Sequence, residues 1–373
     1  MFSKREGILV SKLGTETHGP GRGQENEKST ARSRARKQDP HSPAAGRKTK
    51  NPQPGCGREN KIPAARPRAD IKYGFEVKNV TMKETMNFSV SDDDLQRFSS
   101  ADDLRQFYTG LGLNGLELMP LSKDTQGKVN PDMVVGVHLC CASDWMNLDR
   151  KMLIDHYRDN LETAREMGAE YVVFHVTQVD PEESFTYKLK HTDEEVIRAS
   201  ADLINELLDG QDYPFWFLME NLWWPGLNFL NPDTTRLLLD LVHYEKKGFM
   251  LDTGHFLHTN HDLVNQTEAV AYLHRMLDVQ EEMIPYIRGI HLQQSLTGAY
   301  VKQWLSEPHT LSDDPSTQIC EVFTHIFAID KHQPFTDSGV RGLVERINPD
   351  YVTYEYITEN REQLEEYLKM GKL

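Results

Sequence analysis

Short apolar runs alternate with longer amphipathic segments from residue 71 to the end of the chain. An apolar run of about four to eight residues is typical of a buried strand, and apolar residues that recur every three or four positions are typical of a helix. The pattern predicts strands at residues 72–77, 115–119, 134–140, 171–176, 215–220, 248–252, 287–292 and 351–356. It predicts helices at residues 93–111, 148–167, 193–208, 232–247, 267–284, 316–329 and 361–370, and no convincing helix at 123–130.

This alternation of strands and helices predicts an α/β fold. Helical crossovers pair consecutive strands in parallel, and the near-continuous apolar strands fit burial on both faces. Eight repeats within residues 71–373 match a single (β/α)8 TIM barrel better than an open sheet. A doubly wound sheet is the alternative, but no Gly-x-Gly-x-x-Gly follows an expected strand, so a dinucleotide site has no support.

The first 70 residues differ from the rest in charge and composition. They carry 16 Lys and Arg against 7 Asp and Glu, whereas residues 71–373 carry 26 against 50, a net charge of −24. Because the segment is rich in Gly, Pro, Ser and Arg, it cannot bury enough apolar surface to offset the entropy of ordering it. We expect residues 1–70 to form a disordered basic tail. An arm that binds nucleic acid or an acidic partner is the alternative interpretation.

The spacing of the cysteines and the hydropathy of the chain indicate the cellular compartment in which we expect the protein. Cys56, Cys140, Cys141 and Cys320 show no Cys-x-x-Cys pairing, which favours reduced thiols over disulfides or a cysteine zinc site. No apolar run reaches the roughly 18 residues that a membrane span needs, and no signal-peptide core follows the basic start. We therefore expect a cytoplasmic protein without a membrane-spanning segment.

Most of the expected strands end on, or within two residues of, a side chain that can bind a metal. Six such residues are His138, His175, Glu220, Asp252, His291 and Glu355, and another strand offers Glu117. Each alone would be interpreted as a structural histidine or a solvated or capping carboxylate. A barrel, however, gathers its strand ends round one mouth, where several carboxylates repel one another without a cation. The mixed ligands predict a divalent metal, Mn, Co, Zn or Fe, and disfavour calcium.

Four motifs follow one another in the second half of the chain. They are Glu-Asn at 220–221, Asp-Thr-Gly-His at 252–255, Ile-His-Leu at 290–292 and Glu355 in the last strand. This order resembles the xylose isomerase-like barrel superfamily, which contains sugar isomerases and epimerases together with endonuclease IV. The resemblance covers about residues 71–373. It is specific for the superfamily and weak for the reaction.

In the isomerase and epimerase branch, the resemblance implies one ion held by Glu220, Asp252, His291 and Glu355. Glu220 and Glu355 would be the catalytic residues that remove and return a proton, while the ion stabilises an enediolate. His255 would contact a substrate oxygen. This branch is the leading prediction, with a sugar or sugar phosphate as the substrate.

In the endonuclease IV branch, the resemblance implies a cluster of two or three ions and phosphoester hydrolysis. The additional ligands would be His138, His175, His255, Asp330 and His332. The Asp330-x-His332 pair discriminates best between the branches. Its other interpretation is a loop histidine beside an insertion, because the stretch from His291 to Asp330 is longer than that family's pattern.

The charge of residues 71–373 disfavours nucleic acid as a partner, because binding to a phosphate backbone normally needs a basic surface. The segment after His138, Leu-Cys-Cys-Ala-Ser-Asp-Trp-Met-Asn-Leu, also does not resemble a lesion-probing loop. A third class is a barrel that binds a metal or ligand without turnover, in which Glu220→Gln and Glu355→Gln would change no reaction rate.

Three further residues are candidate substrate contacts. Trp223 and Trp224 follow the strand that ends at Glu220, where their rings would stack on a sugar or a base, or alternatively shield the site. Glu117 is the third. The sequence leaves the oligomeric state open.

Overall fold

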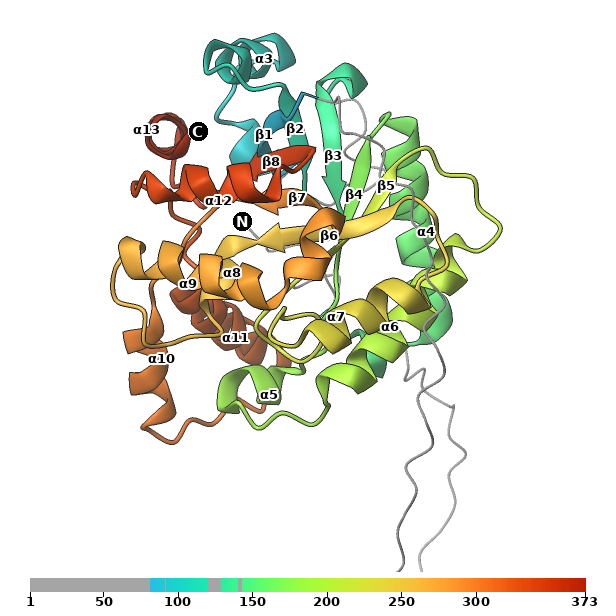
Figure 1. The fold of residues 1–373 in the computed structure, drawn as a ribbon, viewed down its shortest axis with the longest axis vertical. Helices are drawn as coiled ribbons and strands as arrows, with labels where there is room; N and C mark the ends of the chain where they lie inside the picture. The colour runs from blue at the N-terminus through green and yellow to red at the C-terminus, as the bar shows by residue number, and fades with distance from the viewer. Residues whose placement is uncertain (1–80, 91, 120–128, 140–142) are drawn as a thin grey trace, which may run out of the picture. The chain divides into compact units, whose positions relative to one another are not determined.

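Eight parallel strands form a closed barrel in the computed structural model (Figure 1). The structure describes residues 81–90, 92–119, 129–139 and 143–373. Each strand pairs with the next, and β8 pairs with β1. The predicted (β/α)8 TIM barrel is therefore confirmed.

Seven strands lie where the apolar runs predict them. The eight strands are β1 (Lys83–Phe88), β2 (Gly115–Leu118), β3 (Val134–His138), β4 (Tyr171–His175), β5 (Trp216–Glu220), β6 (Lys247–Asp252), β7 (Ile287–His291) and β8 (Tyr351–Tyr354). The expected first strand, at 72–77, lies outside the described residues, as does the expected tail at 1–70. The first barrel strand is instead β1, whose sequence KETMNF is too polar to form an apolar run.

Helices separate most of the strands and pack around the barrel (Figure 1). The longer helices are α3 (Ala101–Gly110), α4 (Arg150–Glu166), α6 (Asp193–Leu208), α7 (Pro232–Leu241), α9 (Gln266–Val279), α10 (Gly298–Leu305), α11 (Pro315–Ile329), α12 (Gly339–Ile347) and α13 (Arg361–Gly371). The shorter ones are α2 (Asp92–Leu95), α5 (Pro181–Thr186), α8 (Thr253–Leu257) and the 3-10 helices η2 (Pro131–Met133), η3 (Trp145–Asn147) and η4 (Glu281–Tyr286).

Helix boundaries differ from the predictions where local capping intervenes. The expected helix at 93–111 is two helices, α2 and α3, because the Ser100 side chain accepts a hydrogen bond from the Asp103 backbone N–H and starts α3. The expected helix at 232–247 ends at Leu241, since Lys247 already belongs to β6. Helices α5, α8, α10 and α12 are not predicted by the pattern.

The barrel interior is filled by side chains that alternate along the strands. Val173, Leu218, Met250 and Tyr351 pack together there, in the manner expected for the interior of a (β/α)8 barrel. A larger apolar cluster packs between the barrel and its helices. The interior residues fix which strand-end side chains point inward, and so determine the composition of the barrel mouth.

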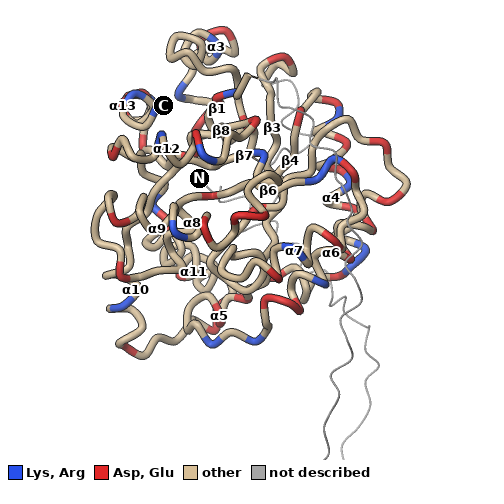
Figure 2. Tube along the Cα trace, viewed as in Figure 1, with Lys and Arg blue, Asp and Glu red and all other residues tan. Residues whose placement is uncertain are grey.

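Acidic and basic residues are interspersed over the described part of the chain, as Figure 2 shows. Among the described residues, no helix is both long and apolar enough to cross a membrane.

Candidate metal centre

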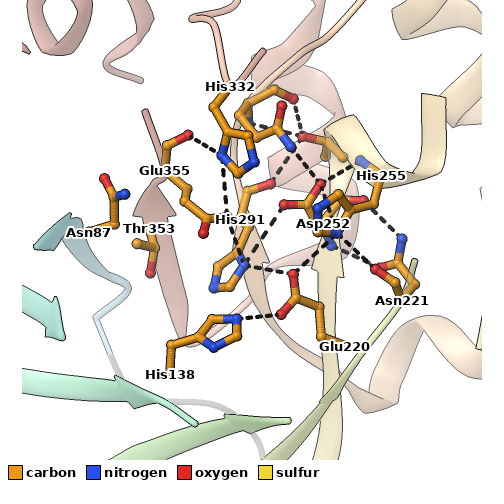
Figure 3. Close-up of polar contacts among 12 residues, drawn as sticks. Asn87, His138, Glu220, Asn221, Asp252, His255, His291, His332, Thr353 and Glu355 are labelled. Atoms are coloured by element: carbon orange, nitrogen blue, oxygen red, sulfur yellow. Dashed lines mark hydrogen bonds and ion pairs between the residues drawn. The ribbon is translucent and has the colours of Figure 1, made fainter. Parts of the chain in front are cut away.

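The inward-facing side chains at the strand ends converge at the mouth of the barrel (Figure 3). Because side chains alternate along a strand, the residue two positions after an interior residue also points inward. Leu218 and Glu220 are related in this way on β5, as are Met250 and Asp252 on β6. The resulting cluster of buried side chains consists of His138, His175, Glu220, Asp252, His291 and Glu355.

Glu220 connects two sets of ligand atoms within this cluster. Its Oε2 lies 3.0 Å from Nε2 of His138 and 3.0 Å from Nε2 of His175. Its Oε1 lies 3.0 Å from Nδ1 of His291. One carboxylate therefore faces two different groups of residues, with one oxygen toward each.

Asp252 and Glu355 complete the second of these sets. One ligand atom from each of Glu220, Asp252, His291 and Glu355 lies within 4.8 Å of the others. Asp252 Oδ2 and Glu355 Oε2 are buried and accept no hydrogen bond from the described residues, although His291 Nδ1 lies 3.2 Å from Glu355 Oε2. Buried carboxylate oxygens without donors are costly, so this donor set fits a divalent cation.

A third set forms beside the first two from residues outside the strands. His255 lies on α8, and Asp330 and His332 follow α11. Asp330 Oδ2 lies 3.1 Å from His255 Nε2 and 2.6 Å from His332 Nε2. His332 has a φ of 48°, in the left-handed region that few non-glycine residues adopt. The chain thus holds backbone strain where the Asp330-x-His332 pair meets His255.

Backbone carbonyls orient three of the histidines. Nδ1 of His138 lies 2.9 Å from the Leu139 oxygen, Nδ1 of His255 2.9 Å from the Asn221 oxygen, and Nδ1 of His332 3.0 Å from the Glu355 oxygen. A carbonyl oxygen can only accept, so each Nδ1 donates its hydrogen, and each Nε2 faces a carboxylate and is the nitrogen that would bind an ion after losing its proton. This arrangement is the one that metal-binding histidines commonly show.

The cluster crowds negative charge into a buried volume. Burial raises the pKa of Asp252 to about 7, and the carboxylates of Glu355 and Glu220 contribute to the rise. Burial acts on Glu220 in the same direction, but the neighbouring histidines His175, His291 and His138 together outweigh it and hold the pKa of Glu220 well below its usual range. Bound cations would neutralise this charge, which is a second reason why the residues fit a metal centre.

The three expected substrate contacts occupy different positions. Trp223 is half-buried at the edge of the cluster, with its ring centroid 5.4 Å from that of His255. Trp224 is only 3% exposed and packs against Tyr187. Glu117 is fully buried, and its Oε2 lies 3.1 Å from Nε2 of His291. Of the three, Trp223 alone is accessible at the mouth, because the other two are enclosed by protein.

Two buried residues at the centre were not predicted from the sequence. His258 lies one helical turn after His255, and its Nε2 lies 3.3 Å from Asp330 Oδ1. Gln293 follows the Ile-His-Leu motif and donates to Asp252 Oδ1 at 2.9 Å. The three-residue spacing between His255 and His258 could have predicted that the two side chains are neighbours on a helix. The Gln293 contact could not be predicted, because it depends on how β6 and β7 pack.

Solved structures with similar folds come from several kinds of protein. A D-tagatose 3-epimerase-like protein is 14% identical, with a TM-score of 0.43, and the match covers 78% of this chain and 98% of that one. Endonuclease IV from Thermus thermophilus is 16% identical, with a TM-score of 0.46 and coverage of 78% and 97%. The IOLI protein with a bound zinc atom is 16% identical, with a TM-score of 0.46 and coverage of 78% and 95%.

A family model gives a more direct assignment than these structures. No curated protein matches the chain in sequence. The model of the xylose isomerase-like TIM barrel matches residues 132–370, which include every residue of the three ligand sets. The chain therefore belongs to the xylose isomerase-like TIM barrel family.

Proposed function

We propose that the protein is a metal-dependent hydrolase of phosphate esters that works with three divalent ions. The observation that carries this proposal is the position of Glu220, whose two oxygens face different sets of ligand atoms. A carboxylate in that position is suited to bridging two ions. The third set, beside the first two, would hold the remaining ion.

We assign the ligands of each ion to the three sets, of which the first two overlap, since His138, His291 and Glu355 also lie within ligand distance of one another. The first consists of His138, His175 and Glu220, the second of Glu220, Asp252, His291 and Glu355, and the third of His255, Asp330 and His332. Ions held by these residues would supply an activated water molecule for attack on phosphorus and positive charge at the leaving oxygen. Trp223 presents a partly exposed aromatic ring at the edge of the centre, where it would contact the substrate.

The protein's own residues hold the centre in a fixed arrangement. Glu220 sets the separation of the first two ligand sets, since both of its oxygens are engaged. The carbonyl oxygens of Leu139, Asn221 and Glu355 fix the ring orientations of three histidines. Preorganised ligands of this kind need little rearrangement during the reaction.

A single-ion isomerase or epimerase is the second candidate. The observation that favours it is the pair Glu220 and Glu355, since an oxygen of each lies within 3.2 Å of His291 Nδ1. Two glutamates that flank one ion suit proton removal and return at a sugar carbon. This reaction, however, gives no role to four of the nine ligands: His138, His175, Asp330 and His332.

The substrate that we propose is a small phosphate ester and not duplex DNA. Residues 71–373 carry 26 basic against 50 acidic residues, and the described basic residues are interspersed with acidic ones. Binding along a DNA backbone depends on Lys and Arg contacts to many phosphates. A small ester would instead need only the ions to neutralise its phosphate.

The test compares two reactions on protein loaded with Zn²⁺, Mn²⁺, Co²⁺ or Fe²⁺. One assay follows hydrolysis of bis(p-nitrophenyl) phosphate and a panel of small phosphate esters. The other follows solvent deuterium entering ketoses and sugar phosphates. We expect metal-dependent hydrolysis that His138→Ala and His332→Ala each reduce at least about 100-fold, because each removes a ligand of a hydrolytic ion. Deuterium incorporation without hydrolysis, unaffected by either variant, would favour the isomerase.

A further inference from the structure

We infer that Gln293 is a positioning residue that couples two of the ion sites, those of Asp252 and Asp330. This inference rests on the three-ion centre of the proposed function and identifies how two of its ligand sets are held together. Gln293 is fully buried. It contacts both carboxylates and belongs to neither ligand set.

The side-chain amide of Gln293 reaches one oxygen of each carboxylate. Its Nε2 lies 2.9 Å from Asp252 Oδ1 and 3.4 Å from Asp330 Oδ1. An amide nitrogen has two hydrogens and can donate to two acceptors at once. The amide is also neutral, so it can lie between two carboxylates without repelling the ions that they bind.

The two carboxylates are held in the same way. Asp252 Oδ1 accepts from the His255 backbone N–H at 2.6 Å as well as from Gln293, and its Oδ2 has no hydrogen bond from the described residues. Asp330 Oδ1 accepts from Gln293 and from Ser295 Oγ, the latter at 3.2 Å. In both, the protein holds Oδ1 through Gln293 and a second donor, while Oδ2 of Asp252 has no donor and Oδ2 of Asp330 faces two histidines of the third ligand set.

The Oδ2 atom of Asp330 points toward the third ligand set. It lies 3.1 Å from His255 Nε2 and 2.6 Å from His332 Nε2. His258 touches only the other oxygen, Oδ1, at 3.3 Å. His258 therefore supports one ion site, whereas Gln293 supports two.

Gly254 makes the approach of Gln293 possible. A Cβ at position 254 would lie 2.0 Å from Gln293 Oε1, closer than atoms can approach. Thr253 fixes the same stretch from the other side, because its Oγ1 donates to the Gln293 carbonyl oxygen at 2.6 Å. The glycine of the Asp-Thr-Gly-His motif thus leaves room for the amide that joins the two sites.

Four variants test this coupling. Gln293→Met removes both donors and keeps an unbranched side chain of similar length. Gly254→Ala displaces Gln293 without changing a ligand. Position 254 lies in helix α8, and alanine stabilises a helix more than glycine does. His258→Phe removes a contact to Asp330 alone. Gln294→Met is the control, since the Gln294 side chain is buried but its Oε1 has no partner among the described residues.

The measurement is a calorimetric titration of metal-free protein with Zn²⁺, repeated with Co²⁺ and followed by absorption. We expect three binding events in the unchanged protein. Gln293→Met and Gly254→Ala should each weaken two of them together by about 10- to 100-fold, the usual effect of losing a group that orients metal ligands. His258→Phe should weaken one event, and Gln294→Met none.

Two kinds of outcome contradict the inference and are distinguishable. If the unchanged protein binds three ions and Gln293→Met and Gly254→Ala weaken none of them, or only one, the coupling is absent and the proposed function stands. If the unchanged protein binds fewer than three ions, both the coupling as stated and the three-ion hydrolase are wrong.

Discussion

Nε2 of His291 lies 3.1 Å from Oε2 of Glu117, within the barrel and on the opposite side of the ring from the ligand atoms. The same Glu117 oxygen accepts from the Tyr171 hydroxyl at 2.6 Å and from Thr353 Oγ1 at 2.8 Å. A carboxylate behind a metal-binding histidine fixes the ring and makes it a stronger ligand. The structure thus gives Glu117 a supporting position behind His291.

Replacing this carboxylate should weaken one ion site. Glu117→Gln keeps the shape of the side chain but removes the charge that strengthens His291, so we expect the affinity of the second ion to fall by about 10-fold or more. Zinc titration measures the change. Tyr171→Phe is the matched control, since it removes a donor to Glu117 and leaves the carboxylate in place. Equal affinities in Glu117→Gln and the unchanged protein would contradict this role.

The close approach of Gly136 to Tyr171 predicts an effect on stability. A Cβ at position 136 would lie 2.2 Å from the Tyr171 ring, so Gly136→Ala must displace the ring that reaches Glu117. Overpacking of this kind typically costs about 1–3 kcal/mol, which urea unfolding would detect. Gly110→Ala is the control, because a Cβ there would meet nothing within 4 Å. Equal urea midpoints for Gly136→Ala and Gly110→Ala would contradict this prediction, and would mean that the Tyr171 ring can move aside without a loss of stability.

The environment of His325, which lies outside the metal centre, predicts that the stability of the fold depends on pH. It packs against Trp304 on α10 and Phe185 on α5, and burial, helped by His309, lowers its pKa to about 4. In the unfolded chain a histidine takes up its proton near pH 6.5. Its neutral form therefore contributes stability above pH 6.5 that is lost as the pH falls toward 4.

The variant His325→Phe tests this account. Thermal unfolding of both proteins between pH 7.5 and about pH 4 should show the unchanged protein losing stability faster on acidification. The variant should therefore become relatively more stable at low pH. Parallel pH profiles for the two proteins would be the opposite result, and would mean that His325 keeps an ordinary pKa in the folded state.

The first 70 residues should be dispensable for the barrel. The described strands close the barrel from Lys83 onward, and we expect deletion of residues 1–70 to leave the thermal transition and the metal content unchanged. Both are measured on the same preparations. A large loss of either would mean that the segment takes part in folding or in the site.

The apolar runs predicted seven strands because a barrel strand is buried on both faces and has few polar residues. The exception is β1, where Thr85 is buried but satisfied by Thr353 Oγ1 at 2.9 Å. A buried polar residue with a hydrogen-bond partner on the neighbouring strand costs little, yet it interrupts the apolar run from which strands are predicted. Short helices such as α8 and α5 span too few residues to show a period.

The candidate ligands could be named from the sequence because they end strands or belong to short motifs, whereas the residues that orient them could not. Asp330 and His332 could be named from one motif, but only the fold brings them to His255. Gln293 looks like any polar residue after a strand, and its role depends on the absence of a Cβ at Gly254, where one would lie 2.0 Å from Gln293 Oε1. Residues whose role is to orient other side chains are difficult to identify from a single sequence.

Metal content per chain tests the central claim most directly. The protein is purified without added metal or chelator, reconstituted with Zn²⁺ and freed of excess, and analysed by elemental mass spectrometry beside the double variant His138→Ala, His332→Ala. We predict about three ions per chain, falling in the variant because the first and third ligand sets each lose a histidine. About one ion per chain in both proteins would contradict the three-ion centre and support a single-ion isomerase.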